Sequence, residues 1–117
     1  MVVAAVDDLL FASRIRTTAT RAGVTVVFAR SPEAIVEAIR THAPRLLIVD
    51  LNGDRMAPVE TIRALRSDTS LPAVPIVAYV SHVDAPLIAA ANDAGADRVL
   101  ARSQFVAQLA DMLGEAR

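Results

Sequence analysis

The chain alternates short runs of β-branched and apolar residues with longer stretches of helical periodicity from end to end. This alternation is typical of repeated strand–helix units around a parallel sheet. Five units can be counted, with predicted strands at residues 2–6, 24–28, 46–50, 76–80 and 98–101. Most of these runs are apolar at every position, as in a sheet covered by helices on both faces. We therefore predict an α/β fold with a five-stranded parallel sheet.

Five helices are predicted from apolar stripes and from residues favoured at helix ends. In the first, apolar and small residues from Phe11 to Ala22 recur on one face. In the last, the buried positions are expected to be Phe105, Leu109, Met112 and Leu113. The predicted start signals of the second to fifth helices are Ser31, Pro58, Asp84 and Ser103, and the predicted stop signals are Gly23, Pro44 and Gly95.

Composition narrows the class of protein. The 117 residues are 54% apolar and 21% charged without a low-complexity tract, so we expect one folded domain spanning residues 1–117. Cysteine is absent, which removes thiolate metal sites, so we expect any metal to be held by oxygen. No secretory leader is visible, and no apolar stretch approaches the roughly 20 residues that span a bilayer. We expect a cytoplasmic protein with no membrane partner.

Charge argues against nucleic acid as a direct partner. The formal net charge is −1 and only 3% of residues are aromatic, which leaves neither a basic field nor a stacking platform. All 12 basic residues are arginine, and lysine is absent. A mechanism that needs an ε-ammonium group is therefore excluded.

Three acids follow two of the predicted strands: Asp7 and Asp8 after the first, and Asp50 at the end of the third. If these strands are parallel neighbours, the acids converge at the edge of the sheet where ligands bind in such folds. Clustered carboxylates repel one another, and a hard divalent cation or covalent chemistry on one acid would offset the repulsion. The alternative is that the acid pair caps a helix and Asp50 caps a loop.

The order of several short motifs resembles a known family over nearly the whole chain. The motifs are Val6-Asp7-Asp8, Pro44-Arg45-Leu46-Leu47-Ile48-Val49-Asp50, Pro75-Ile76-Val77 and Ala94-Gly95-Ala96-Asp97. Together they resemble the receiver domain of two-component signalling, which includes the stand-alone chemotaxis response regulator. The resemblance implies a doubly wound, flavodoxin-like sheet with strand order 2-1-3-4-5 and five helices.

The resemblance also implies roles for individual residues. Asp50 matches the phosphoacceptor, which receives its phosphoryl group from a histidine kinase or phosphotransfer protein. Asp8 matches the direct Mg²⁺ (or Mn²⁺) ligand and Asp7 the acid acting through a metal-bound water. Asn52 matches the residue whose backbone carbonyl joins Asp50 among the protein ligands of the metal. Oxygen ligands bridging to phosphate are chemistry that Mg²⁺ favours.

Several positions depart from the family pattern. Arg102 and Ser103 stand where a lysine and usually a proline are expected, so Arg102 either replaces the lysine or is simply solvated. Val80 stands where a threonine or serine hydroxyl is usual; Ser81, one residue later, either contacts the phosphoryl group or serves the loop. Val99 replaces the usual aromatic switch residue, and the loop after the third strand is shorter than usual.

Two functional hypotheses follow. The first is a stand-alone receiver that accepts a phosphoryl group on Asp50 and signals through the face formed by the fourth helix, fifth strand and fifth helix. The second is a degenerate receiver that binds a protein independently of phosphorylation. An enzyme is not expected, since no catalytic triad, glycine-rich nucleotide loop or general-base pair can be assembled. Dimerisation through the last helices is left open.

Overall fold

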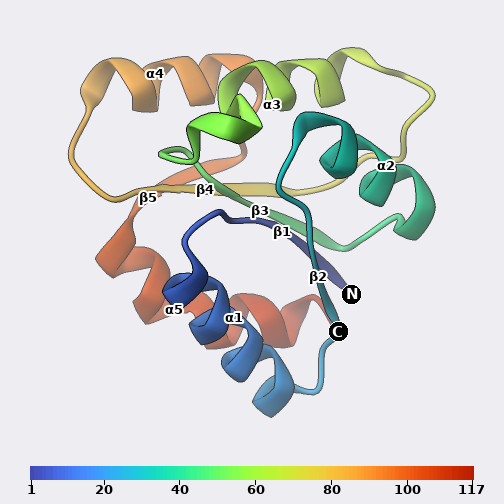
Figure 1. Cartoon of the computed structure of the whole chain (residues 1–117), viewed down its shortest axis with the longest axis vertical. Helices are drawn as coiled ribbons and strands as arrows, with labels where there is room; N and C mark the ends of the chain where they lie inside the picture. The colour runs from blue at the N-terminus through green and yellow to red at the C-terminus, as the bar shows by residue number, and fades with distance from the viewer.

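A computed structural model describes residues 1–117, and its strands form a single parallel sheet in the order β2-β1-β3-β4-β5 (Figure 1). The strands are β1 (Val2–Ala5), β2 (Val26–Phe28), β3 (Leu46–Asp50), β4 (Ile76–Val80) and β5 (Arg98–Ala101). Every neighbouring pair is parallel. The predicted five-stranded sheet and its strand order are confirmed.

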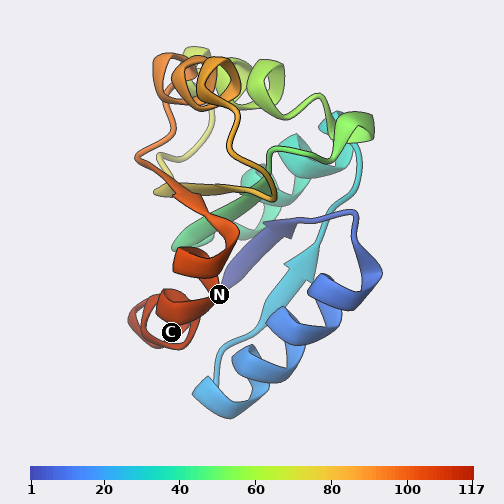
Figure 2. The same cartoon turned by 90° about the vertical axis from the view of Figure 1, so that its left-hand side faces the viewer.

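Five helices cover the two faces of this sheet. They are α1 (Leu9–Ala22), α2 (Pro32–His42), α3 (Pro58–Ser67), α4 (Ala85–Ala94) and α5 (Arg102–Glu115), with a short 3-10 helix, η1 (Asp54–Met56), before α3. Helices α1 and α5 lie on one face, and α2, α3 and α4 lie on the other (Figures 1 and 2). The fold is therefore doubly wound, as expected.

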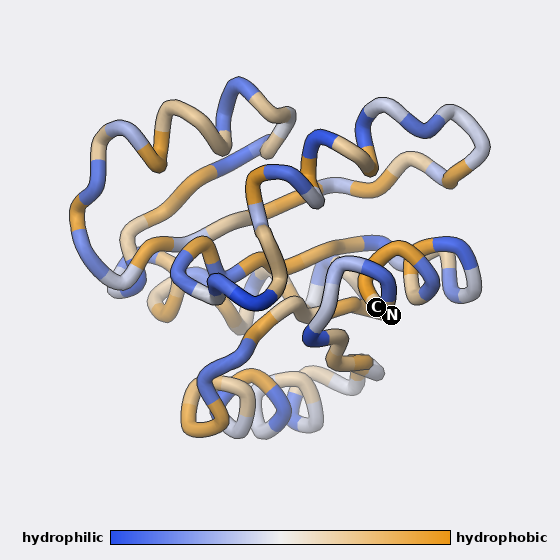
Figure 3. Tube along the Cα trace, turned by 45° about the horizontal axis from the view of Figure 1, so that its top comes forward, coloured by the Kyte–Doolittle hydropathy of each residue, from blue (hydrophilic) through white to orange (hydrophobic).

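The strands are apolar at successive positions because each face of the sheet packs against helices. In β3, Leu47 and Val49 join the cluster beneath α2, α3 and α4. Leu46 and Ile48 point the other way and join the cluster beneath α1 and α5. Figure 3 shows the apolar residues concentrated along the central strands. Burying one large apolar side chain contributes about 1.5–3 kcal/mol, so the two cores together hold the layers in place.

Most of the predicted helix signals act as expected. The side chains of Ser31 and Asp84 accept backbone N–H groups at the starts of α2 and α4. Gly23 and Gly95 end α1 and α4 with φ of 71° and 119°, in the left-handed region that favours glycine.

Three boundaries differ from the sequence prediction. Strand β1 ends at Ala5 rather than at residue 6, and β2 begins at Val26 rather than at residue 24. Helix α5 begins at Arg102, so Ser103 lies inside its first turn and is not the cap. The side chain of Gln104 instead accepts the N–H of Ala101 at 3.1 Å. This is the reciprocal half of a capping box, in which the residue three positions after the cap accepts the N–H of the cap residue, whereas no side chain at Ala101 caps the first turn.

The chain ends lie side by side (Figure 1). The Met1 amino group donates a hydrogen bond to the Ala116 carbonyl oxygen at 3.2 Å. None of the helices combines the length and apolar character needed to cross a membrane.

Candidate functional site

Three acidic residues lie at the edge of the sheet formed by the carboxyl ends of β1 and β3. Asp50 is the last residue of β3, whereas Asp7 and Asp8 lie between β1 and α1. The two strands are parallel neighbours with Ala5 opposite Val49, so their carboxyl ends are level. The topology thus brings to one edge the acids on which the sequence analysis centred.

Asp50 is the most buried of the three, with only 5% of its surface exposed. Its Oδ1 accepts the N–H of Asn52 at 2.9 Å, and no other protein group hydrogen-bonds to the carboxylate. Burial raises the pKa of Asp50 above its ordinary value of 3.8, and the charges of the two neighbouring acids add to the rise. Asp50 therefore presents one carboxylate oxygen, Oδ2, that has no protein donor.

Asp8 is the N-cap of α1 and also forms an ion pair. Its Oδ1 accepts the N–H groups of Leu10 at 2.9 Å and Phe11 at 3.1 Å. Its Oδ2 lies 3.3 Å from Nη2 of Arg102. The Phe11 N–H and then Arg102 lower the pKa of this carboxyl below 3.8. The capping interpretation of the acid pair is thus correct for Asp8.

Asp7 is held by an arginine of the short helix η1, which follows β3. The Arg55 Nη2 lies 3.0 Å from Asp7 Oδ1, and the Arg55 Nε lies 3.3 Å from Oδ2. In this arrangement a guanidinium group therefore faces each of the two acids that follow β1. Positive charge from the protein itself offsets part of the repulsion that the sequence analysis assigned to a metal ion.

The donor set suits Mg²⁺ in chemical type but is not gathered around one point. Carboxylate oxygens of Asp7, Asp8 and Asp50 and a backbone carbonyl are the hard ligands that this ion prefers. No group of three His, Asp or Glu side chains is placed to hold a metal in this arrangement. In this arrangement the carboxylates of Asp7 and Asp8 are paired with Arg55 and Arg102 instead.

Asn52 links the loop after β3 to the end of β4. Besides donating its N–H to Asp50, it accepts the N–H of Ser81 on Oδ1 at 2.8 Å. The backbone of Ser81 thus lies beside the acids, but its hydroxyl makes no hydrogen bond within the protein. Val80 is buried in the cluster beneath α2, α3 and α4, where it supplies no donor.

Arg102 lies at the start of α5 and is fixed by two contacts. Besides its ion pair with Asp8, its guanidinium carbon lies 4.2 Å from the centroid of the Phe11 ring. Such cation–π contacts are worth about 0.5–1 kcal/mol at exposed sites. Arg102 also acts electrostatically on Asp50, whose pKa it lowers against the opposing effect of burial.

Tyr79 is a residue of this site that the sequence analysis did not identify. It lies in β4 directly opposite Asp50 of β3, and only 1% of its surface is exposed. Its ring stacks on Phe105 with centroids 4.7 Å apart and is tilted against Phe11 at 4.9 Å. The only available signal was its position as the single tyrosine within the fourth apolar run.

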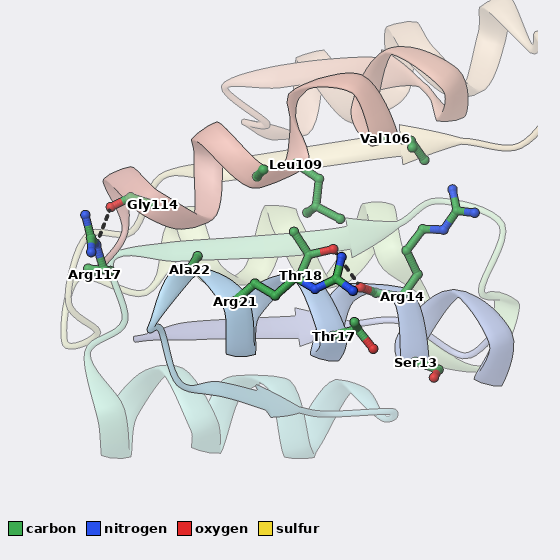
Figure 4. A pocket seen from close by; sticks show the side chains of 11 residues that line it. Ser13, Arg14, Thr17, Thr18, Arg21, Ala22, Val106, Leu109, Gly114 and Arg117 are labelled. Atoms are coloured by element: carbon green, nitrogen blue, oxygen red, sulfur yellow. Dashed lines mark hydrogen bonds between the residues drawn. The ribbon is translucent and has the colours of Figure 1, made fainter.

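Two hollows flank α1. One, of about 930 Å³, lies beside the acids and is lined by Arg102, Val99 and the exposed Leu10 and Val83, among others. The other, of about 840 Å³, runs between α1 and α5 and is lined by arginine, small polar and apolar residues but by no acid (Figure 4). The first hollow includes Arg102 and Ser81 but none of the three acids, whereas the second includes none of the predicted site residues.

Comparisons with known proteins agree with this architecture. Residues 2–113 match the family described as the response regulator receiver domain. The signal receiver domain of a response regulator from Bermanella marisrubri is similar, with a TM-score of 0.85 and 22% identity over 98% of this chain and 95% of that chain. No match was found among curated proteins.

Two further solved structures show the same fold. A CheY-like receiver domain protein from Methanospirillum hungatei has a TM-score of 0.78 and 14% identity, over 98% of this chain and 94% of that chain. A response regulator from Thermotoga maritima has a TM-score of 0.77 and 18% identity, over 98% of this chain and 94% of that chain. At these identities the structural likeness establishes the fold alone.

Proposed function

We propose that this chain, which belongs to the family of response regulator receiver domains of two-component signalling, accepts a phosphoryl group on Asp50. A receiver domain is a signalling module rather than an enzyme. The observation that carries the proposal is the environment of Asp50: a buried carboxylate at the carboxyl edge of the sheet, with one oxygen held by Asn52 and the other without a protein donor. We propose that residues 1–117 form one receiver-like domain.

In the proposed reaction, the free Oδ2 of Asp50 attacks the phosphorus atom of a phosphohistidine on a histidine kinase or phosphotransfer protein. The P–N bond breaks, its electron pair stays on the imidazole, and an acyl phosphate forms on Asp50. The N–H of Asn52 keeps the other oxygen in place and thereby orients the attacking one. The guanidinium of Arg102 is the nearest candidate for balancing the added negative charge, in place of the lysine usual in the family.

The proposed metal ligands are side-chain oxygens of Asp7, Asp8 and Asp50 and the backbone carbonyl of Asn52. When bound, Mg²⁺ would neutralise charge on the phosphoryl oxygens. Without the ion, Arg55 and Arg102 neutralise the charges of Asp7 and Asp8, respectively. We propose that these arginines release the two carboxylates when the ion binds.

Protein partners are proposed for two surfaces. Exposed apolar side chains at the rim of the hollow beside the acids, Leu10 and Val83, suit a protein that approaches Asp50 to donate the phosphoryl group. The face formed by α4, β5 and α5 is proposed to contact the target. Val99, in the middle of this face, makes a smaller contact surface than the aromatic residue usual there.

The test is phosphorylation by a small donor. The protein is incubated with acetyl phosphate and Mg²⁺, and its intact mass is measured. We expect one phosphate adduct in the wild type and none in Asp50→Asn, whereas Asp54→Asn, which changes an acid in the following loop, retains the adduct. Absence of an adduct in the wild type, under conditions that label an ordinary receiver, would contradict the proposal.

A second candidate is a receiver-like module that binds its partner independently of phosphorylation. It is favoured by the valine at position 80, which provides no hydroxyl, and by the arginine partners of the two acids after β1. This hypothesis predicts that partner affinity is the same for the wild type, for Asp50→Asn and for the wild type with beryllofluoride. A change in affinity with either treatment would favour phosphoacceptance instead.

A further inference from the structure

The hydroxyl of Tyr79 is a buried polar group without a partner. It is the only buried side-chain nitrogen or oxygen in the protein that makes no hydrogen bond. The side chain is almost completely buried, and its ring is fixed between Phe11 and Phe105. A buried hydroxyl left unpaired costs about 1–3 kcal/mol, and most such groups find a partner. This hydroxyl therefore needs an acceptor that its aromatic neighbours do not supply.

The acceptor best placed for it is Asp50. The two residues are paired across β3 and β4, so their side chains emerge on the same face of the sheet. One oxygen of Asp50 already accepts the N–H of Asn52, and the other has no donor. Each group thus lacks what the other provides: the phenol has a proton to donate, and the carboxylate has free lone pairs.

Electrostatics agree with this pairing. Burial raises the pKa of Tyr79 above its ordinary value of 10.0, and the charge of Asp50 raises it further, against the opposing effect of Arg102. The phenol is therefore protonated at neutral pH. It can act toward a carboxylate only as a donor.

We propose that Tyr79 donates a hydrogen bond from its hydroxyl to Asp50 and, as a positioning residue, shortens the lifetime of the phosphoryl group on that aspartate. The inference rests on the proposed function of Asp50. In this proposal Tyr79 brings a hydroxyl to the site from the face of β4 opposite to Val80. Position 80 is the one at which the family's usual threonine or serine is missing.

The effect on lifetime follows from where charge develops during hydrolysis. Water attacks phosphorus, the bond from phosphorus to the Asp50 oxygen breaks, and its electron pair returns to the carboxylate. The phosphate leaves with the oxygen of the water, and the released proton passes to phosphate or solvent. Oδ2, the oxygen that carried the phosphoryl group, gains negative charge as this bond breaks, so a phenol donor to Oδ2 stabilises the transition state more than it stabilises the acyl phosphate, in which Oδ2 is only a weak acceptor.

The first test is Tyr79→Phe, which keeps the ring and removes only the hydroxyl. The protein is labelled with acetyl phosphate, the donor is removed, and the decay of the adduct is followed by intact mass. We expect the aspartyl phosphate to last about three- to tenfold longer than in the wild type. Phe105→Leu is the control, because it loosens the same aromatic cluster without touching the hydroxyl. An unchanged lifetime in Tyr79→Phe, or an equal extension in the control, would overturn the proposal.

The second test does not depend on phosphorylation. The chain has one tyrosine and no tryptophan, so its tyrosine fluorescence and ultraviolet Raman bands report on Tyr79 alone. Donation to a carboxylate quenches tyrosine emission; we therefore expect stronger emission and an altered Raman doublet in Asp50→Ala, with no change in Asp68→Ala. If the wild type forms no phosphate adduct, the proposed function is contradicted, and these spectra still test the hydrogen bond between Tyr79 and Asp50. Spectra identical in the wild type and Asp50→Ala would overturn it.

Discussion

Arg55 and Asp7, which are 48 positions apart in the sequence, form a two-point ion pair at the edge of the sheet. On the neighbouring acid, Arg102 forms a second pair with Asp8. The protein thus supplies two positive charges where its own carboxylates would otherwise repel one another. Any cation that enters this edge must compete with them.

This competition predicts that Arg55→Ala tightens Mg²⁺ binding. The arginine side chain is 80% exposed, and exposed ion pairs are worth about 0.2–1 kcal/mol, so we expect the dissociation constant to fall about two- to fivefold. The measurement is a Mg²⁺ titration followed by amide shifts near Asp8 and Asp50. Arg40→Ala is the matched control, because it removes an arginine paired with Glu37 on the surface of α2. Equal tightening in both variants would mean that only the net charge matters.

A second prediction concerns Arg102→Gln. We expect the pKa of Asp8 to rise, because Arg102 lowers it through a hydrogen bond and through its charge. The pKa should remain below its ordinary value, since the Phe11 N–H, the largest contributor, is retained. Carboxyl-carbon shifts measured against pH would follow the change. Arg16→Gln is the control, because Arg16 also stacks on a phenylalanine, Phe28, but forms no ion pair with Asp8. An unchanged pKa in Arg102→Gln would contradict the ion pair.

Local signals in the sequence were sufficient to predict the elements of the fold: apolar runs, capping residues and glycines suited to left-handed turns specify the strands and helices. The strand order that places Asp7, Asp8 and Asp50 at one edge was implied by the resemblance to receiver domains, not by these local signals. The helix-start prediction was wrong at Ser103, because α5 begins one residue earlier, with Ala101 at the cap position and Gln104 accepting its N–H.

The contacts around the acids were not predictable in the same way. Arg55 lies in the short 3-10 helix η1, which no apolar periodicity marks in the sequence, so its pairing with Asp7 appears only in three dimensions. Tyr79 was hidden for a different reason: its relation to Asp50 depends on the register of β3 against β4. An apolar run does not reveal which of its residues lies opposite a given position in the next strand.

A third prediction tests what fixes α3 to the segments that precede β4 and β5. Arg66 donates hydrogen bonds of 2.8 Å to the Gly95 carbonyl, the Val74 carbonyl and Oδ2 of Asp97. We expect Arg66→Ala to lower the free energy of unfolding by about 1–2 kcal/mol, because it removes charged donors from these acceptors. Urea unfolding measures the change. Arg63→Ala, on the exposed side of the same helix, should be nearly neutral. A loss of similar size there would indicate an effect of helix propensity or charge rather than of the bonds.

The fourth prediction is that Asp50→Asn stabilises the protein at neutral pH. Asparagine keeps an oxygen for the Asn52 N–H but carries no charge, so the cost of burying a carboxylate disappears. Urea unfolding of both proteins across a range of pH measures the difference. At neutral pH we expect a higher free energy of unfolding in the variant.

The pKa shift of Asp50 determines how the stability difference between Asp50→Asn and the wild type changes with pH. Because the pKa of Asp50 is raised on folding, the native state binds its proton more tightly than the unfolded state does. The associated stability of the wild type is fully present below the unfolded pKa of about 3.8 and is lost as the pH rises through the folded pKa. The advantage of Asp50→Asn should therefore be smallest in acid and grow with pH. Asp68→Asn, where Ser70 lowers the pKa of the native carboxyl, should show the opposite trend. A pH-independent difference for Asp50→Asn would mean that packing, rather than ionisation, sets the stability at this position.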